Sequence, residues 1–237
     1  MYDKLPSELK ENALFCLWRY EERDGNLTKV PYQINGSCAD ATKKNTFADY
    51  RLVANAAYGY DGIGMGVFGT FCAIDIDHCV AGGKLTSMAQ DIVDTMNSYT
   101  EFSPSGTGIR IIFKVLGLSY DKKRYYINNR KISLEVYVAG KTNRFVTLTG
   151  NAVKECGIEE RTTELMTVLE KYMVKAVKER KSKTTVPGSY LTDESVISKA
   201  MASKRGDKFK ALWNGNIPED KSHSEADQAL CTMLAFR

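Results

Sequence analysis

Two aspartates stand two residues apart in an apolar stretch, residues 71–77 (FCAIDID). The isoleucines favour a strand, and side chains two apart on a strand point to the same face. Asp75 and Asp77 should therefore lie together, where each raises the pKa of the other unless a cation lies between them. Hard divalent cations prefer carboxylate oxygens. The pair is a candidate metal site; the alternative is two solvated or turn-capping aspartates at a strand end.

A Ser/Gly turn, residues 103–108 (SPSGTG), precedes a predicted strand. Backbone N–H groups freed by the two glycines can point at phosphate oxygens, as in an anion nest, and the hydroxyl groups add donors. The alternative is a simple hairpin loop whose glycines serve the turn. The residues that this turn would contribute to phosphate binding are Ser103, Ser105, Gly106, Thr107 and Gly108.

Charged side chains on two predicted strands extend this set. Arg110 and Lys114 are an even number apart on the strand 109–114, so they share a face that can bring positive charge to a triphosphate. Glu135 lies inside the apolar stretch LEVY. An acid there usually has a partner or a metal, because unpaired burial is costly. The alternative for Glu135 is an edge-strand position facing solvent.

Composition limits the classes of protein. The 237 residues are enough for one large domain or one domain with an appendage, and 43% hydrophobic and 26% charged residues are ordinary for a soluble globular chain. The sequence shows neither a run near the ~18 apolar residues of a membrane span nor an apolar signal peptide. The six cysteines show no CxxC spacing, which indicates reduced thiols and a cytoplasmic location and argues against zinc. Two histidines make His-based triads improbable.

Positive charge is concentrated in one short segment. The net charge is +4, and residues 171–183 carry six bases against Glu179 alone, so the rest of the chain is close to neutral. A bulk electrostatic argument for nucleic acid therefore rests on this segment. Lys178 and Arg180 are its candidate nucleic-acid contacts; the alternative is a solvated helix face.

Periodicity and turn residues predict the elements that position these side chains. Residues 6–17 should form a short helix that runs into a hairpin, whose strands cover 14–20 and 27–32. The glycine-spaced stretch 62–68 and the stretches 109–114, 130–137 and 144–149 should be strands. Helices are expected over 46–57 (capped by Asn45 or Thr46), 85–99, 159–177, 192–203 and 223–236, with a linker at 181–188 and a separating stretch at 206–220.

The order of these stretches resembles a known family. IDID, then SPSGTGIRIIFK, then LEVY with RFVTLTG is similar to the three-motif signature of the archaeo-eukaryotic primase superfamily, in particular to primase–polymerase domains that begin phage and prophage replication proteins. WRYEERDGNLTKVPY and GIGMGVF also resemble that group. SHSEADQALCTMLAF resembles the start of the helical domain that follows the catalytic domain there.

The resemblance implies an α+β fold with an RRM-like core, in which helices flank a central mixed or antiparallel sheet. Residues 1–170 would form the catalytic domain and 171–190 a basic helix end and linker. Residues 191–237 would begin a helical module, cut from something longer because its last helix has nothing to pack against. A helicase domain would follow in the full protein. A cytoplasmic location in a bacterial host cell is implied as well.

The resemblance also implies DNA-templated nucleotidyl transfer from nucleoside triphosphates on a single-stranded DNA template. Asp75, Asp77 and Glu135 would hold two Mg²⁺ or Mn²⁺ ions, and residues 103–110 would bind the nucleotide phosphates. Lys29 and Arg144 are further candidates for phosphate or template contacts. The superfamily commonly has His where this chain has Arg110. Arginine keeps a permanent positive charge for phosphate, but a proton-transfer role of that His would not carry over.

Two other functions use the same residues. A metal-dependent nuclease would use the three acids with water as the nucleophile, although the phosphate loop argues against it because a nuclease has no triphosphate to bind. A non-catalytic module that binds nucleic acid or a partner would have the fold without the activity. Incubation with labelled DNA and deoxynucleotides separates extension from shortening, and an Asp75→Ala variant would leave the function of a non-catalytic module unchanged.

Overall fold

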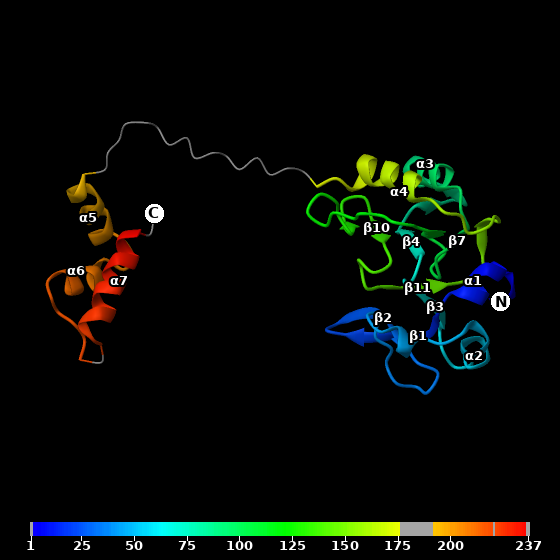
Figure 1. The fold of residues 1–237 in the computed structure, drawn as a ribbon, viewed down its shortest axis with the longest axis horizontal. Coiled ribbons are helices and arrows are strands. Elements are labelled where there is room, and N and C mark those ends of the chain that lie inside the picture. Colours follow the sequence, from blue (N-terminus) through cyan, green and yellow to red (C-terminus); the bar gives the residue numbers. More distant parts are fainter. Residues whose placement is uncertain (1, 176–191, 220, 236–237) are drawn as a thin grey trace. The chain divides into compact units, whose positions relative to one another are not determined.

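A computed structural model describes residues 2–175, 192–219 and 221–235 (Figure 1). The chain divides into two compact units, residues 1–177 and 178–237, each with its own internal packing. Lys178, Arg180 and the linker expected at 181–188 lie outside the described residues. Asp75, Asp77, Glu135 and the Ser/Gly turn fall in the first unit, so this unit contains the candidate site.

The first sheet of this unit is antiparallel, with the order β11-β3-β1-β2. Its strands are β1 (Phe15–Arg23), β2 (Asn26–Tyr32), β3 (Gly62–Gly66) and β11 (Phe145–Leu148). The predicted hairpin is confirmed: Asp24 and Gly25 both have positive φ, 51° and 74°, as a two-residue turn between twisted strands requires. In β3, a Cβ at Gly62 would lie 2.8 Å from the Trp18 ring nitrogen. Glycine there therefore allows the close approach of Trp18.

The second sheet has the order β12-β7-β8-β4-β10-β9, and its pairings are also antiparallel. Its strands are β4 (Phe71–Ile76), β7 (Thr100–Phe102), β8 (Ile109–Lys114), β9 (Asn128–Asn129), β10 (Leu134–Tyr137) and β12 (Ala152–Lys154). The β5 (Val80–Ala81) and β6 (Lys84–Leu85) strands form a separate small hairpin. This is the antiparallel α+β architecture that the resemblance implied.

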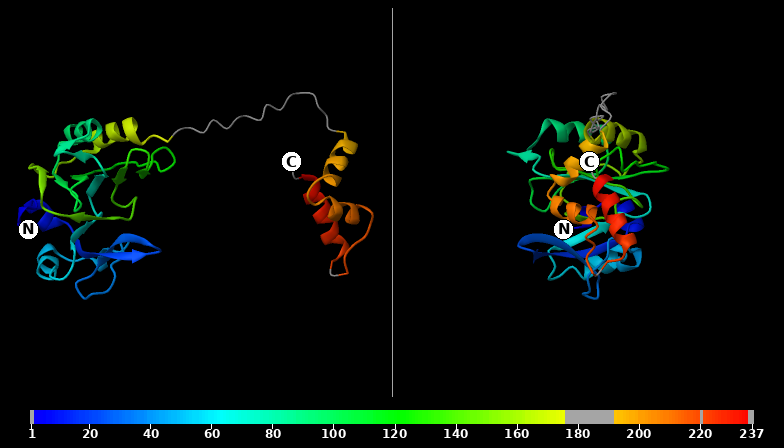
Figure 2. Two further views of the ribbon diagram at one scale, coloured as in Figure 1. Left: turned by 180° about the vertical axis from the view of Figure 1, so that it is seen from behind. Right: turned by 90° about the vertical axis from the view of Figure 1, so that its left-hand side faces the viewer.

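Alternation along β4 gives the second sheet two different faces. Cys72, Ile74 and Ile76 pack into a core with α3 (Ser87–Met96), α4 (Thr162–Val168) and the π-helical turn η3 (Leu169–Met173). The helices α3 and α4 lie together on one side of the sheet in Figures 1 and 2. Asp75 alternates with these residues and therefore points to the opposite face.

That opposite face meets the first sheet through a second core. Phe71 and Ala73 of β4 pack there with Ile63 and Met65 of β3 and with Leu9. The helices α1 (Ser7–Asn12) and α2 (Tyr50–Asn55) and the short turns η1 (Tyr2–Lys4) and η2 (Lys44–Thr46) belong to this part of the unit. Asp75 thus lies between the two sheets, beyond the end of an apolar core.

Several predicted boundaries were wrong. The helix expected over 46–57 begins only at Tyr50, because Ala48 exchanges two backbone hydrogen bonds with Phe15, and its N-cap is Asp49. The helix expected over 85–99 ends at Asn97, which has a φ of 37°.

The other boundary errors have similar causes. The strand expected over 130–137 begins at Leu134, after Ser133 with a φ of 52°. The helix expected from 159 begins at Thr162, because Glu160 bridges to Lys114. Each prediction failed where a residue of the expected element pairs elsewhere or adopts positive φ.

The second unit contains α5 (Asp193–Met201), α6 (Gly206–Trp213) and α7 (His223–Ala235). The helix α6 was missed, since residues 206–220 were expected only to separate two helices. Its apolar residues Phe209 and Leu212 are buried, and the ring of Trp213 stacks on Phe209 at 5.6 Å. Within the described residues, no helix is long and apolar enough to cross a membrane.

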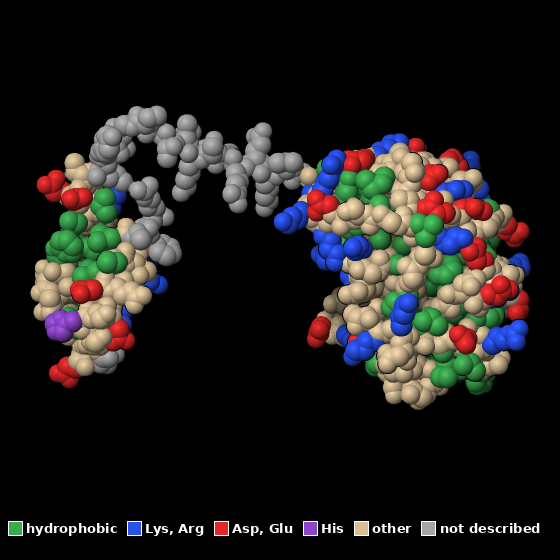
Figure 3. Space-filling view, in the orientation of Figure 1, with side chains coloured by type: hydrophobic (Ala, Val, Ile, Leu, Met, Phe, Trp, Pro, Cys, Tyr) green, Lys and Arg blue, Asp and Glu red, His purple; other side chains and the backbone are tan. Residues whose placement is uncertain are grey.

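Basic and acidic side chains are interspersed on the face of the first unit seen in Figure 3. Part of this mixture is paired: Arg124 lies 2.7 Å from Glu170, and Lys171 lies 2.9 Å from Asp91. Lys171 is one of the six basic residues in the segment 171–183, and its charge is paired with Asp91. We therefore look for ligand-binding charge in individual side chains of the site rather than in the net charge of the surface.

Candidate active site

Four charged residues form a row across the second sheet. In the strand register, Glu135 of β10 faces Asp75 of β4, Asp75 faces Arg110 of β8, and Arg110 faces Glu101 of β7. Directly paired residues of antiparallel strands share a face. The row therefore lies on the face toward the first sheet, where the sheets shield it from solvent.

Asp75 is the acid of the row with the fewest hydrogen bonds to its carboxylate. Its Oδ2 lies 3.4 Å from Arg110 Nη2, and its buried Oδ1 has no hydrogen-bond partner among the described residues. Burial raises the pKa of Asp75, and Asp77 and Glu135 add to this, whereas Arg110 and Lys29 oppose it. A buried carboxylate oxygen without a partner is the arrangement that a bound cation would relieve.

Asp77 and Lys29 lie beside Asp75. Asp77 is exposed just after the end of β4, and its backbone N–H donates to Ser133 O at 3.0 Å. Lys29, on β2 of the first sheet, is half-buried. Burial and Arg110 lower the pKa of Lys29, whereas Asp75 and Asp77 raise it. The fold therefore brings Lys29 from the other sheet to both aspartates.

Glu135 is Asp75's neighbour, but both its oxygens are engaged. Asn128 Nδ2 donates to one and the Tyr137 hydroxyl to the other, each at 2.6 Å. Burial, Asp75 and Glu135 raise the pKa of Tyr137, which therefore stays a proton donor to Glu135. Among the described residues no three His, Cys, Asp or Glu side chains are gathered in a ready metal cluster. The carboxylate oxygens of Asp75 and Asp77, one of which has no partner among the described residues, fit a divalent cation. Glu135 could bind the cation only after giving up its hydrogen bonds from Asn128 and Tyr137.

The Ser/Gly turn closes on itself more tightly than the anion-nest interpretation required. Gly106 N–H donates to Ser103 O, and Gly108 N–H donates to Ser103 Oγ at 3.1 Å, so neither group is free. The hydroxyl groups of Ser103, Ser105 and Thr107 form a chain with 3.0 Å steps. These hydroxyl groups, rather than the glycine N–H groups, are what the loop offers to a ligand.

The loop is held against the end of the aspartate strand. A Cβ at Gly108 would lie 2.7 Å from Ile76 O and 3.2 Å from Asp77 Cα. Only glycine allows this approach without a shift of the backbone. The sequence therefore places glycine at the one loop position that touches the aspartate strand.

Two predicted phosphate contacts lie elsewhere. Lys114 is at the other end of β8 from Arg110, where its ammonium group lies 2.6 Å from Glu8 Oε1. Arg144 is exposed next to β11 and contributes to the electrostatic environment of Tyr137. The structure therefore brings Arg110 and Lys29 to Asp75, keeps Arg144 near its margin and leaves Lys114 apart.

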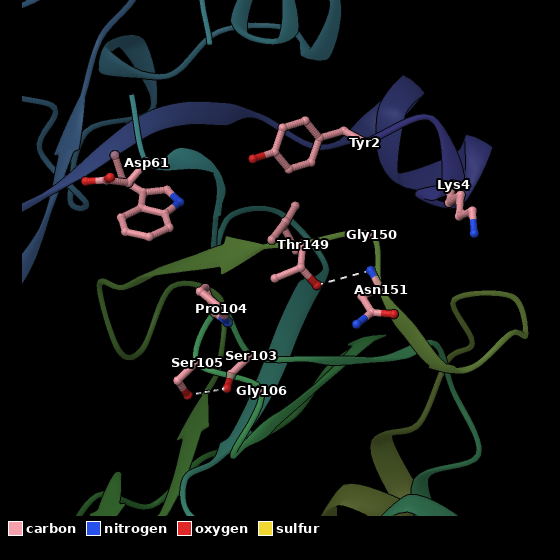
Figure 4. A pocket seen from close by; sticks show the side chains of 12 residues that line it. Tyr2, Lys4, Asp61, Ser103, Pro104, Ser105, Gly106, Thr149, Gly150 and Asn151 are labelled. Atoms are coloured by element: carbon pink, nitrogen blue, oxygen red, sulfur yellow. Dashed lines mark hydrogen bonds between the residues drawn. The ribbon is translucent and has the colours of Figure 1, made fainter. Parts of the chain in front are cut away.

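A cavity of ≈ 620 Å³ opens beside this site. The Ser103–Pro104–Ser105–Gly106 segment forms one wall, and the segment of Thr149, Gly150 and Asn151 forms another (Figure 4). Tyr2, Lys4, Trp18, Asp61 and Leu148 complete it. The ammonium group of Lys29 lies 6.0 Å from the Trp18 ring, so the same lysine is close to both the cavity wall and the aspartates.

Glu101 was not among the site residues predicted from the sequence. It is fully buried and accepts hydrogen bonds from the backbone N–H groups of Thr149 and Gly150, both at 2.9 Å, and from the Tyr99 hydroxyl at 3.0 Å. Burial raises its pKa, whereas these donors and Arg110 lower it. Its position two residues before the Ser/Gly turn was the available signal, because a short hairpin there places it opposite Arg110.

Comparison with known proteins shows which kind of protein this chain resembles. No family model matches the chain. A protein of Nitratiruptor phage NrS-1 described as "DNA Primase-polymerase" is 25% identical over 235 residues, which cover 96% of this chain and 30% of that protein. The chain thus spans less than a third of the length of this relative. The match over almost the whole chain supports the resemblance of this chain to a phage primase–polymerase.

Proposed function

We propose that the first unit catalyses DNA-templated nucleotidyl transfer, in primer synthesis or chain extension, in the replication of a phage or another mobile element. The observation that carries this proposal is a buried Asp75 oxygen without a partner among the described residues, on a strand whose end touches the Ser/Gly loop. The same loop forms one wall of the cavity of ≈ 620 Å³. The cavity is large enough for a nucleoside, since ligand pockets commonly have ~300–1,000 Å³. The name of the phage relative supports the same reaction class.

The acidic residues of the site would bind metal, and its basic residues would attract the triphosphate. Asp75 and Asp77 would hold Mg²⁺ or Mn²⁺, and Glu135 would join them by exchanging its hydrogen bonds from Asn128 and Tyr137. Ions held there would supply two-metal chemistry, namely activation of a 3′-hydroxyl and stabilisation of charge on the leaving pyrophosphate. Lys29 and Arg110 place two positive charges beside the aspartates, where a triphosphate is attracted.

The remaining groups orient the nucleotide and the nucleic acid. The hydroxyl groups of Ser103, Ser105 and Thr107 face the phosphates, and the Trp18 side of the cavity receives the nucleoside. Arg144, at the margin, contacts phosphate or template. A single-stranded DNA template, nucleoside triphosphates and a downstream helicase domain are the proposed partners.

Primer extension tests the proposal. A labelled primer on single-stranded DNA is incubated with deoxynucleotides and Mg²⁺ or Mn²⁺, and the products are separated by length. We expect extension that a chelator abolishes and that Asp75→Ala reduces at least 100-fold, the order of loss when charge stabilisation at the reacting centre is removed. Asp94→Ala, on the exposed face of α3, is the matched control and should extend normally.

Each other outcome rejects a stated part of the proposal. Shortening of the primer instead of extension would identify a nuclease. Full incorporation by Asp75→Ala would show that the metal assignment is wrong. Nucleic-acid binding with no incorporation under any condition would indicate the non-catalytic module.

A further inference from the structure

The buried Arg110 lies, in the strand register, between two acidic residues. Arg110 is 2% exposed and pairs in register with Asp75 on one side and with Glu101 on the other. Its only close carboxylate contact is the 3.4 Å one to Asp75, and Nε and Nη1 have no hydrogen-bond partner among the described residues. A buried charge is tolerated only with compensating charge nearby, and Glu101 supplies part of it.

The same Glu101 holds a wall of the cavity. Its two oxygens accept from Thr149 N–H and Gly150 N–H, and both of these residues line the cavity. The Thr149 hydroxyl in turn donates to Phe102 O at 2.8 Å, next to Glu101 on β7. The buried carboxylate therefore ties Thr149 and Gly150 to β7, next to the backbone bond from Phe102 N–H to Asn151 O and the β7–β12 pairing that follows it.

We propose that Glu101 is a positioning residue that fixes the Thr149–Gly150 wall of the nucleotide cavity and balances Arg110, which leaves Asp75 available for a divalent cation. This inference rests on the proposed function and adds a residue that neither the motifs nor the phage relative assigns. Without the Glu101 charge, Asp75 is the remaining acid paired with Arg110 in the strand register, so the guanidinium competes more strongly with the cation for Asp75. Without its second acceptor oxygen, one wall N–H loses its partner.

Glu101→Gln tests both links, because glutamine keeps the size but has no charge and only one acceptor oxygen. Binding is measured in a Trp213→Phe background, so that Trp18, which lines the cavity, is the only tryptophan and its fluorescence reports dATP. Titration calorimetry measures Mn²⁺ binding. We expect dATP affinity to fall about tenfold, the equivalent of one buried hydrogen bond to a charged group, and Mn²⁺ affinity to fall by a similar factor.

Glu101→Asp separates the two roles. Aspartate keeps the charge beside Arg110 but is too short to reach both wall N–H groups. We therefore expect Mn²⁺ affinity to recover to within about threefold of wild type while dATP affinity stays low. This variant also keeps the test open if glutamine prevents folding.

Ser98→Ala is the matched control. Ser98 is fully buried in the same segment and donates to Ile112 O at 2.6 Å, but it contacts neither the cavity wall nor Arg110. It should lower the melting temperature and leave both affinities unchanged. Wild-type affinities in Glu101→Gln, or equal losses in Ser98→Ala, would overturn the inference. Failure of primer extension by wild-type protein that still shows these binding differences would reject the proposed function alone.

Discussion

The carboxylate of Asp75 lies between two sheets. One oxygen has no partner in the part of the chain that the structure describes, and the other lies 3.4 Å from the Arg110 guanidinium. Burial is the largest cause of its raised pKa and outweighs the attraction of Arg110. The charged form is therefore held in the folded state at a cost in stability. Such a cost is typical of residues whose charge serves a bound ligand.

This cost predicts that the free energy of unfolding depends on pH differently in wild type and in an Asp75→Asn variant. Because the folded pKa of Asp75 lies above its unfolded value, its contribution to stability is present at low pH and is lost as the pH rises through the folded pKa. Asparagine does not titrate. Without divalent cations, Asp75→Asn should match wild type below about pH 4 and be more stable by roughly 1–3 kcal/mol near neutral pH.

Urea unfolding at several pH values measures this difference. Added Mn²⁺ should reverse the order near neutral pH, because a ligand that binds only the folded wild type stabilises it by mass action. The two proteins share every other titrating group, so their difference isolates Asp75. Parallel pH profiles would contradict the account of Asp75.

At the scale of elements, the Ser/Gly loop and the aspartate strand act as one unit because Gly108 lets them touch. A methyl group at Gly108 would lie 2.7 Å from Ile76 O and 3.2 Å from Asp77 Cα, so backbone must move. We expect Gly108→Ala to destabilise the protein by about 1–3 kcal/mol and to weaken dATP and Mn²⁺ binding together, as measured by fluorescence and calorimetry.

Gly117→Ala is the comparison for Gly108→Ala. Gly117 has a φ of 67° but open space around its Cβ position. It should cost about 1 kcal/mol through backbone strain and leave both affinities intact. If Gly108→Ala bound both ligands as tightly as wild type, the close approach of loop and strand would have no functional role.

Some helices, strands and site residues could be predicted from local sequence signals, and others could not. The β1–β2 hairpin was predictable because Asp-Gly demands one turn geometry, and the alternation along β4 correctly gave the face of Asp75. Glu101 was not predictable from its own strand, because its role depends on the register of β7 against β8 and on a wall 48 residues away. Lys114 followed the alternation rule but lies at the far end of β8, beside Glu8.

At the scale of the whole molecule, the candidate active site belongs to one of two units. The acids, the loop and the cavity all lie within residues 1–177, whereas residues 178–237 contain a helical group with its own small core around Phe209. The helix α6 escaped prediction because its Gly206 start resembles a loop; a Cβ there would lie 2.0 Å from Met201 O. The phage relative is much longer, which leaves room for further modules in proteins of this type.

A crystal structure with Mn²⁺ and a non-hydrolysable deoxynucleoside triphosphate tests the central claim most directly. Anomalous scattering locates manganese without reference to the protein coordinates. We predict manganese bound by Asp75 and Asp77, phosphates against the hydroxyl groups of the Ser/Gly loop, and the nucleoside in the cavity beside Trp18. Manganese absent from both aspartates while the nucleotide is bound would contradict the account.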